Sequence, residues 1–414
     1  MKIITLDEIT FNNFANKHKY RNYYQTSSYG RTIKNQGYDI HYIGIIDDNN
    51  SLLGASLLLY KEVFMNYKIA YAPRGLLIDY TNANNINELT NRIKKLLSKQ
   101  GFMTLKIDPY VPLNIRERNG KIVNINNEGN VIIENLKTAG FEYLGPNLFF
   151  ENEKPRFEAI VILNKNIQDI YKSFEKRVRN KIKKAIRSGV EIYKGGKNEI
   201  PIFYEFVKKK YNRPIEYYID LYNNFENHID IYFAKLNTET FVITNRIQYE
   251  KEIEVNNTLA NKIQTTDNNN VKKRLINEKI ESDKLVSVYK KNLVWATKLL
   301  KDNPNGLLIG SCFNLIYDNV CYLIIEGFNQ KFRSLNPNYL IKWKMINDYK
   351  KMNLKYINLN AVSGEFEKIT KFSGLNEMKL GFNSLITEYI GEFELVINSL
   401  PYNLYKNLNK EKKK

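Results

Sequence analysis

The chain contains 414 residues, more than one domain core usually accommodates, so we expect two or three domains. Hydrophobic residues make up 43% of the sequence and aromatic residues 13%, a composition that excludes a disordered protein. The formal net charge of +19 favours an anionic partner such as nucleic acid, phosphate groups or a membrane surface.

Cysteine and histidine are sparse. Cys312, Cys321 and three scattered histidines show neither a disulfide framework nor the spacing of metal ligands. The amino-terminal stretch MKIITLDEIT lacks the apolar core of a signal peptide. No apolar run approaches the roughly 20 residues of a membrane-spanning helix. We therefore expect a cytoplasmic protein that holds no metal ion.

Strand-like and helix-like segments alternate along the first 150 or so residues, which is typical of an α/β layer architecture. Leu89, Ile93 and Leu97 recur at helical spacing, and Gly101 follows them as a carboxy-terminal cap. The predicted helices cover 6–18, 86–100 and 132–139. The predicted strands cover 40–47, 51–64 with a break at Gly54, 68–72 before a turn at 73–75, and 102–108.

A second α/β unit begins near residue 156 with the strand-like stretch EAIVIL and contains a strongly basic amphipathic helix. The apolar face of this helix is predicted to consist of Phe174, Val178, Ile182, Ala185 and Ile186. Lysines and arginines fill the other face, which is either merely solvated or a surface that contacts RNA phosphates. Further strands are predicted over 306–317, 319–328 and 356–362, and a helix over 336–351.

The middle of the chain differs in kind, because 215–303 contains neither glycine nor proline. Two helical segments, 240–265 and 271–301, flank the polar turn TDNNN, which predicts an antiparallel helical hairpin projecting from the body. The first segment carries a weak apolar stripe of Ile243, Ile247, Ile253, Leu259 and Ile263. The second carries a better one of Val271, Leu275, Tyr289, Leu293, Ala296 and Leu300.

Three short stretches carry candidate functional residues, each with a plainer alternative. Asp108 in LKIDP ends a strand, where it could orient or deprotonate an amine, or simply start a turn. Arg213 and Tyr217 in RPIEY lie four residues apart and, if helical, could grip a phosphate or carboxylate, or pack a helix start. Lys379 lies in the apolar run of SGLNEMKLGFNS, which reads as a strand, so its ammonium either faces water or is held in a site.

Several glycine motifs are missing from the sequence. There is no G-x-G, no Walker sequence and no G-x-S-x-G elbow, which disfavours a nucleotide triphosphate, a dinucleotide and a serine hydrolase. An acyltransferase dependent on acetyl-CoA would usually show a glycine-rich pyrophosphate turn, and that class is disfavoured for the same reason.

Taken in order, seven stretches resemble the Fem family of peptidoglycan-bridge aminoacyltransferases, which depend on tRNA. They are YAPRGLLIDY, LKIDPYV, RVRNKIKKAIRSGV, RPIEYY, FRSLNPNYL, SGLNEMKLGFNS and YIGEFELV. The resemblance implies an α/β (α+β) fold with two GNAT-like acyltransferase domains and an inserted antiparallel helical hairpin, a coiled-coil arm. We expect the first domain over 1–154, completed by 384–405, the second over 155–238 and 304–383, and the arm over 239–303.

The resemblance also implies a reaction. Members move an amino acid from aminoacyl-tRNA to a stem-peptide amine of a muropeptide precursor, nucleotide-linked or lipid-linked, without a cofactor. By motif position, Lys379 would assist acyl transfer, held rigidly in its strand towards the ester, and Asp108 would be the base. Arg213 and Tyr217 would hold the precursor's phosphates. A further phosphate-binding lysine is expected near the first helices, and we choose Lys34.

Arg31 is the alternative to Lys34, and Tyr322 is assigned to the acceptor site by its place in CYLIIEG. The sequence departs from the family pattern at Met378, which replaces a phenylalanine, at Ile325, which replaces a second tyrosine, and in NLNAV, which lacks an aspartate and glycines. The residues expected to contact tRNA are Arg177, Arg179, Lys181, Lys183 and Lys184.

The rival interpretation is a non-catalytic nucleic-acid-binding or coiled-coil adaptor that uses the hairpin as a docking arm. It explains the charge and the long helices but gives the LKIDP and RPIEY stretches no purpose. In either case the expected partners are anionic. For the transferase they are aminoacyl-tRNA, a muropeptide precursor and a peripheral contact with the inner face of the membrane, and the protein is a monomer or a homodimer through the arm.

Overall fold

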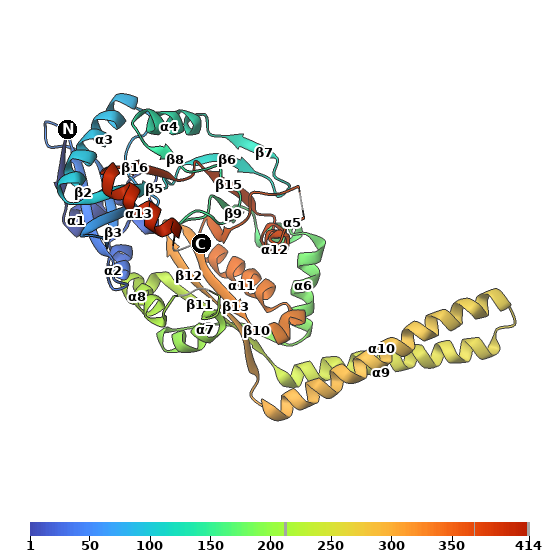
Figure 1. The fold of residues 1–414 in the computed structure, drawn as a ribbon. Helices are drawn as coiled ribbons and strands as arrows, with labels where there is room; N and C mark the ends of the chain where they lie inside the picture. The colour runs from blue at the N-terminus through green and yellow to red at the C-terminus, as the bar shows by residue number, and fades with distance from the viewer. Residues whose placement is uncertain (211–212, 368, 412–414) are drawn as a thin grey trace.

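Two β-sheets, each flanked by helices, organise the chain, and a pair of long helices projects from them (Figure 1). The computed structural model describes residues 1–210, 213–367 and 369–411. The sheet of the first lobe has the strand order β1-β2-β3-β4-β5-β16-β8. These strands are β1 (Lys2–Thr5), β2 (Asp39–Ile46), β3 (Leu52–Phe64), β4 (Tyr67–Ala72), β5 (Phe102–Ile107), β16 (Phe393–Val396) and β8 (Glu142–Tyr143).

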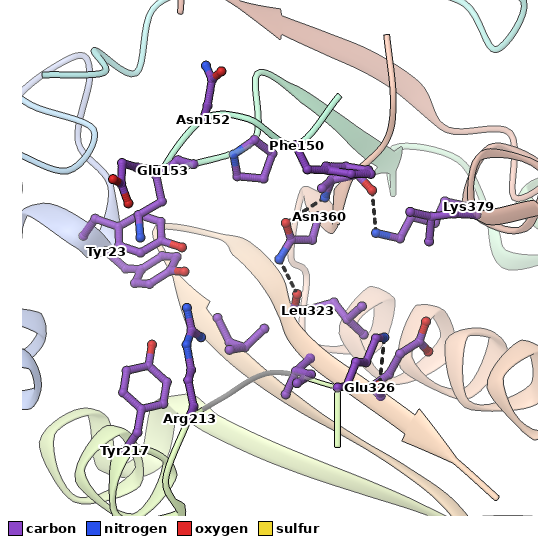
Figure 2. A pocket seen from close by; sticks show the side chains of 18 residues that line it. Tyr23, Phe150, Asn152, Glu153, Arg213, Tyr217, Leu323, Glu326, Asn360 and Lys379 are labelled. Carbon is purple, nitrogen blue, oxygen red and sulfur yellow. Dashed lines mark hydrogen bonds between the residues drawn. The ribbon is translucent and has the colours of Figure 1, made fainter. Parts of the chain in front are cut away.

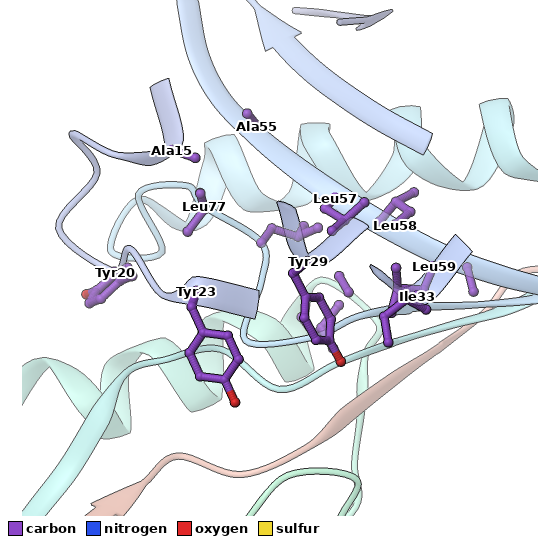
Figure 3. Close-up of a cluster of buried hydrophobic side chains, with 14 of the residues drawn as sticks. Ala15, Tyr20, Tyr23, Tyr29, Ile33, Ala55, Leu57, Leu58, Leu59 and Leu77 are labelled. Atoms are coloured by element: carbon purple, nitrogen blue, oxygen red, sulfur yellow. The ribbon is translucent and has the colours of Figure 1, made fainter. Parts of the chain in front are cut away.

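Helices cover this first sheet, and its central strands are accordingly apolar on both faces. In β3 the successive residues Leu57, Leu58 and Leu59 are all buried, and Figure 3 shows Tyr29 and Ile33 of α2 in the same cluster of buried side chains. The helices of this lobe are α1 (Glu8–Ala15), α2 (Ser27–Lys34), α3 (Ala83–Lys99), α4 (Asn127–Thr138) and α13 (Ser399–Glu411). β3 runs continuously through Gly54, where a break was predicted, but its pairing with β2 shifts register between Leu52 and Gly54.

The sheet of the second lobe has the order β10-β11-β12-β13-β14-β9-β15-β6-β7. Its strands are β10 (Val190–Gly195), β11 (Ile229–Leu236), β12 (Leu307–Tyr317), β13 (Val320–Phe328), β14 (Tyr356–Ala361), β9 (Phe157–Ile162), β15 (Leu385–Tyr389), β6 (Pro112–Arg116) and β7 (Ile122–Ile125). Its helices are α5 (Ile167–Ser173), α6 (Lys176–Arg187), α7 (Ile200–Val207), α8 (Ile215–Phe225), α11 (Pro337–Lys351) and α12 (Ser373–Leu380). The mixed α/β class expected from the sequence is confirmed.

The two lobes exchange strands. β6 and β7 come from the first part of the chain, yet they extend the second sheet by pairing β6 with β15. In return β16, near the carboxy terminus, inserts between β5 and β8 of the first sheet. The covalent path therefore crosses between the lobes several times, which fixes their relative position.

The basic helix α6 buries Val178, Ile182 and Ala185, as its sequence indicates. Ile186 was expected on the same face, but its side chain is 54% exposed, so that part of the prediction is wrong. Each step of four residues advances about 40° around a helix beyond a full turn. Two such steps from Val178 carry Ile186 off the buried face.

The projecting arm consists of α9 (Thr238–Thr265) and α10 (Asn269–Asp302), which leave the body after β11 and return to it at β12 (Figure 1). The apolar stripe predicted for the first helix is wrong at Ile243 and Ile247, which are 51% and 58% exposed. Polar contacts take part in joining the helices instead, with the Ser282 hydroxyl donating to Glu252 at 2.7 Å and Asn256 donating to Asp283. No helix in the described part of the chain is both long and apolar enough to cross a bilayer.

One glycine fixes how closely α7 approaches β13. A Cβ built on Gly327 would overlap the Phe206 carbonyl and lie 3.0 Å from Val207 Cγ1. We predict that Gly327→Ala lowers the free energy of unfolding by at least about 1–3 kcal/mol, because the helix must move off the strand. The matched control is Gly374→Ala in α12, where a Cβ meets nothing within 4 Å. It should be neutral or stabilise by about 0.5–1 kcal/mol. Urea unfolding of both variants measures the contrast, and equal midpoints would contradict it.

Candidate active site

A cavity of about 320 Å³ lies where segments of both lobes meet (Figure 2). Tyr23 and Tyr24 of the first lobe form one wall, and β13 and the end of β14 form another. Four cationic side chains line it, against the two carboxylates of Glu153 and Glu326. These cations are Lys154, Lys210, Arg213 and Lys379. The cavity is therefore suited to an anionic ligand.

Lys379 reaches the cavity from a helix and not from a strand, so the predicted strand is wrong. The reason lies in the residues that α12 buries, Asn376, Lys379 and Leu380, which are spaced as on one helical face. Asn376 fixes the helix by accepting from the Ser363 backbone N–H at 2.9 Å and donating to the Ser363 carbonyl at 3.1 Å. Two of the three buried residues are polar, so the apolar residues alone suggested the two-residue repeat of a strand and not the helical repeat that the structure has.

The Lys379 ammonium is held at a defined place. Its side chain is buried, and Nζ donates to the Ala361 carbonyl at 2.7 Å (Figure 2). Burial lowers the pKa of Lys379 to about 7, against the opposing effect of Glu326, and the nearby Lys342 and Lys210 lower it further. Near neutral pH this group can donate or accept a proton, as an acid–base catalyst must.

Glu326 and Lys342 form a buried ion pair beside Lys379. Burial alone would raise the pKa of Glu326, but Lys342 and Lys210 hold it below its usual value. The Lys210 ammonium also donates to the Glu326 carbonyl at 3.1 Å. One carboxylate thus lies among three lysines, and the positive charge left over faces the cavity.

Arg213 and Tyr217 enter the cavity from the side opposite Lys379 (Figure 2). Arg213 precedes α8 and is not itself helical, and its guanidinium lies 4.7 Å from the centre of the Tyr217 ring. Lys154 lines the same cavity, with Nζ 4.2 Å from the Tyr24 ring centre. Burial, and then the charge of Arg213, lower the pKa of Lys154 to about 8. This end presents two cations and a phenol for a ligand such as a phosphate.

Asp108 lies just beyond the cavity wall, at the end of β5. Its carboxylate accepts from the Arg74 backbone N–H at 2.7 Å and from the Tyr71 hydroxyl at 3.0 Å, and it pairs with the Arg74 guanidinium at 3.5 Å. Burial raises the pKa of Asp108, while Arg74 lowers it. Both hydrogen bonds end on Oδ1, whereas the buried Oδ2 has only the ion pair with Arg74 among the described residues. The carboxylate is tied to Arg74, a geometry that suits a residue that positions its neighbours.

The structure does not bring Lys34 and Tyr322 into this cavity, as judged from the described residues that line it. Lys34 is exposed at the end of α2, and its alternative Arg31 pairs with Glu8 and donates to Asn224 at 3.2 Å. Tyr322 lines a second cavity, of about 540 Å³.

The two cavities share a wall of aromatic rings. Tyr322 of the second cavity packs edge-on against Tyr23 of the first, with ring centres 4.9 Å apart. A side chain that moved at this contact would therefore change both cavities at once.

The five basic residues predicted to contact tRNA divide into two groups. Arg177 pairs with Glu377, Arg179 donates to the Lys172 carbonyl at 2.8 Å, and Lys181 donates to the Tyr339 hydroxyl at 2.9 Å. These three are engaged with the protein itself. Lys183 and Lys184 are exposed and border a shallow hollow together with Asn180 and Arg187.

Comparison with known proteins decides the family, because the FemAB family matches residues 6–410. The chain belongs to the FemAB family. Aminoacyltransferase FemA of Staphylococcus epidermidis is 24% identical over 421 residues, covering 100% of both chains. FemA of Staphylococcus aureus is 25% identical, covering 100% of this chain and 99% of that one. The crystal structure of FemX has the same fold, with a TM-score of 0.71, 20% identity and coverage of 98% and 99%. This FemAB-family chain is an acyltransferase.

Sequence reasoning did not identify Lys154, Lys210 and Glu326 as residues of this FemAB-family cavity. Lys154 stands in a loop and Lys210 ends a run of lysines, so neither belongs to a pattern that separates it from solvated lysines. Glu326 did leave a signal, since it is a carboxylate inside the apolar strand VCYLIIEGF. A charged residue in a buried strand needs a partner, and Lys342 supplies it.

The lowered pKa of Lys379 makes the stability of the enzyme depend on pH. The folded-state pKa is about 7 and the ordinary value 10.5, so between these limits the unfolded chain binds more protons. The wild-type free energy of unfolding therefore gains from rising pH in this window. We predict that the stability of Lys379→Met relative to wild type falls between about pH 7 and pH 10.5, as urea midpoints would show. Lys371→Met, at an exposed lysine before α12, should show no such trend. A difference constant with pH would contradict the assignment.

Proposed function

We propose that this enzyme transfers an amino acid from aminoacyl-tRNA to the stem-peptide amine of a peptidoglycan precursor, forming the interpeptide bridge. The observation that supports it is a two-ended cavity, with a buried lysine of near-neutral pKa at one end and the Arg213–Tyr217–Lys154 group at the other. FemA relatives named as aminoacyltransferases support the same reaction type. Because aminoacyl-tRNA is made in the cytoplasm, we place the reaction there.

The reaction needs little covalent catalysis, since the ester on tRNA is already activated. The acceptor nitrogen forms a bond to the ester carbonyl carbon, the bond from that carbon to the ribose oxygen breaks, and one proton passes from nitrogen to that oxygen. Holding the two reactants together supplies up to about 7–11 kcal/mol in ideal cases. The Lys379 ammonium stabilises the oxyanion of the tetrahedral intermediate by about 3–4 kcal/mol. Its pKa also lets it relay the proton.

The acceptor is a muropeptide precursor, nucleotide-linked or lipid-linked, and both forms carry phosphates. Arg213 with Tyr217, and Lys154 beside Tyr24, are the groups we assign to these phosphates. A guanidinium can bind phosphate oxygens in pairs, whereas the lysine acts as a point charge. The peptide would then extend towards Lys379 at the opposite end.

Aminoacyl-tRNA, as donor, needs a basic outer surface. Lys183 and Lys184 on α6 are exposed and unengaged in the contacts described, so we assign phosphate contacts to them first. Arg177, Arg179 and Lys181 are already bonded within the protein, and we assign them a supporting role in shaping the helix.

The transfer itself can be tested by incubating the protein with charged tRNA and a nucleotide-linked muropeptide and measuring the mass added. Lys379→Ala should lower turnover about 10²–10³-fold without unfolding the protein, because it removes the cation at the oxyanion. Asp108→Asn should have a milder effect, since Asp108 acts through Arg74. Lys371→Ala is the matched control and should keep full activity.

An unchanged rate in Lys379→Ala would remove this residue from the mechanism. Product formed from acetyl-CoA and not from charged tRNA would show a CoA-dependent transferase instead. Binding of tRNA with no product from either donor would favour the adaptor.

The precursor site can be located by comparing three charge removals. Arg213→Ala and Lys154→Ala should each raise the KM for the precursor about 10–100-fold with little change in kcat, the effect of losing one charge-assisted hydrogen bond. Lys34→Ala should leave KM unchanged, because that side chain is exposed at the end of α2. A rise in KM for Lys34→Ala as large as for Lys154→Ala would extend the phosphate site to α2 and contradict our placement.

A further inference from the structure

The carboxy-terminal helix α13 exposes a stripe of leucines that nothing in the proposed reaction uses. Leu400, Leu404 and Leu408 lie at i, i+4 and i+8 and are 75%, 51% and 46% exposed. The opposite face of the helix is anchored, with Tyr402 buried and its hydroxyl bonded to Glu394 of β16. The stripe is therefore held facing outwards by the fold.

A second exposed apolar residue lies in a turn whose neighbouring residue packs near α13, and it comes from a distant part of the sequence. Met65, 76% exposed, forms the turn between β3 and β4 with Asn66, and the ring of Phe64 lies 6.3 Å from the ring of Tyr405 on α13. Met65 and Asn66 both have positive φ, of 47° and 65°. Such two-residue turns favour Asn, Asp or Gly. A methionine at this position is costly and gains nothing from burial in the protein.

We propose that α13 and the β3–β4 turn form a membrane-docking surface that inserts Met65, Leu400, Leu404 and Leu408 into the headgroup region of an anionic lipid bilayer. An interfacial helix of this kind lies in the membrane plane with its apolar face about 5–10 Å deep. The surface differs from the cavity, and vesicle binding is measured without substrates, so this inference can fail or hold independently of the proposed function.

The positive charge of the carboxy-terminal segment favours an anionic lipid surface, rather than a second copy of the chain, as the occupant of this surface. Residues 399–414 contain five lysines and a single glutamate, Glu411. Two such segments would repel each other, whereas anionic lipids attract lysines near the surface by about 1 kcal/mol each. Four apolar side chains also fall well short of the roughly 20–30 residues on each side of a standard protein interface.

Co-sedimentation with vesicles tests the surface, using phosphatidylcholine alone and phosphatidylcholine mixed with phosphatidylglycerol. The wild type should bind the anionic vesicles at least about tenfold more tightly, and added salt should weaken that binding. Leu400→Ser/Leu404→Ser/Leu408→Ser should reduce it at least about tenfold. A control triple, Ile9→Ser/Ile247→Ser/Val294→Ser, removes residues that are 74%, 58% and 64% exposed elsewhere and should bind as wild type.

Met65→Asn separates loss of binding from loss of folding. Asparagine suits the positive φ of the turn, so this variant should unfold at a higher temperature than wild type and yet bind anionic vesicles more weakly. The proposal is overturned if the wild type does not bind anionic vesicles or if the leucine triple binds as well as wild type. It is also overturned if sedimentation velocity shows a wild-type dimer that the leucine triple dissociates, because the stripe would then join two copies.

Discussion

One buried guanidinium links the two lobes beside the cavity, in addition to the strands that the lobes exchange. Arg74, in the turn after β4, pairs with Asp108 of the first lobe at 3.5 Å and with Glu158 of β9 in the second at 2.9 Å. Its guanidinium also lies 4.5 Å from the ring centre of Tyr389, whose hydroxyl donates to Glu158. Removing one member of a buried ion pair costs about 3–5 kcal/mol, because the partner charge is left uncompensated. Arg74 also donates to the carbonyl of Pro155, which lines the cavity. The same side chain therefore links the relative placement of the lobes to the position of this cavity wall.

Burial gives the cavity its chemistry and also costs stability. An ammonium in a low-dielectric site resists protonation, which is why Lys379 titrates near neutrality and not at its ordinary value. The hydrogen bond to the Ala361 carbonyl and the negative charge of Glu326 compensate only part of that cost, because Glu326 is already ion-paired with Lys342. The fold thus keeps the Lys379 ammonium without a carboxylate partner that fully balances its charge. This condition is expected of active sites rather than of structural ion pairs.

The sequence predicted the architecture better than the local structure of the site. The spacing of apolar residues and the glycines that follow helices located most helices and strands, because most of these elements bury one face. The same signal failed at α12, where Asn376 and Lys379 are buried for their polar contacts, and at Ile243 and Ile247, where partly polar contacts join the arm helices. The positions of the Lys154 and Arg74 side chains are set in part by residues more than 80 positions away in the sequence, where the two lobes meet. A local sequence pattern does not encode such contacts. Only Glu326, a charge within a buried strand, could have been identified from its surroundings.

The charge excess in the cavity links ligand binding to the stability of the site. Four cationic side chains face two carboxylates, one of which is already paired with Lys342. Without a ligand, Lys154 and Lys379 reduce this excess by losing protons more easily, as their pKa values of about 8 and about 7 indicate. A phosphate held by Arg213 and Lys154 would reverse that tendency and favour the charged lysines. Because a ligand that binds only the folded state stabilises it, an anionic substrate would both order the cavity and shift its lysines towards the cationic form that oxyanion stabilisation requires.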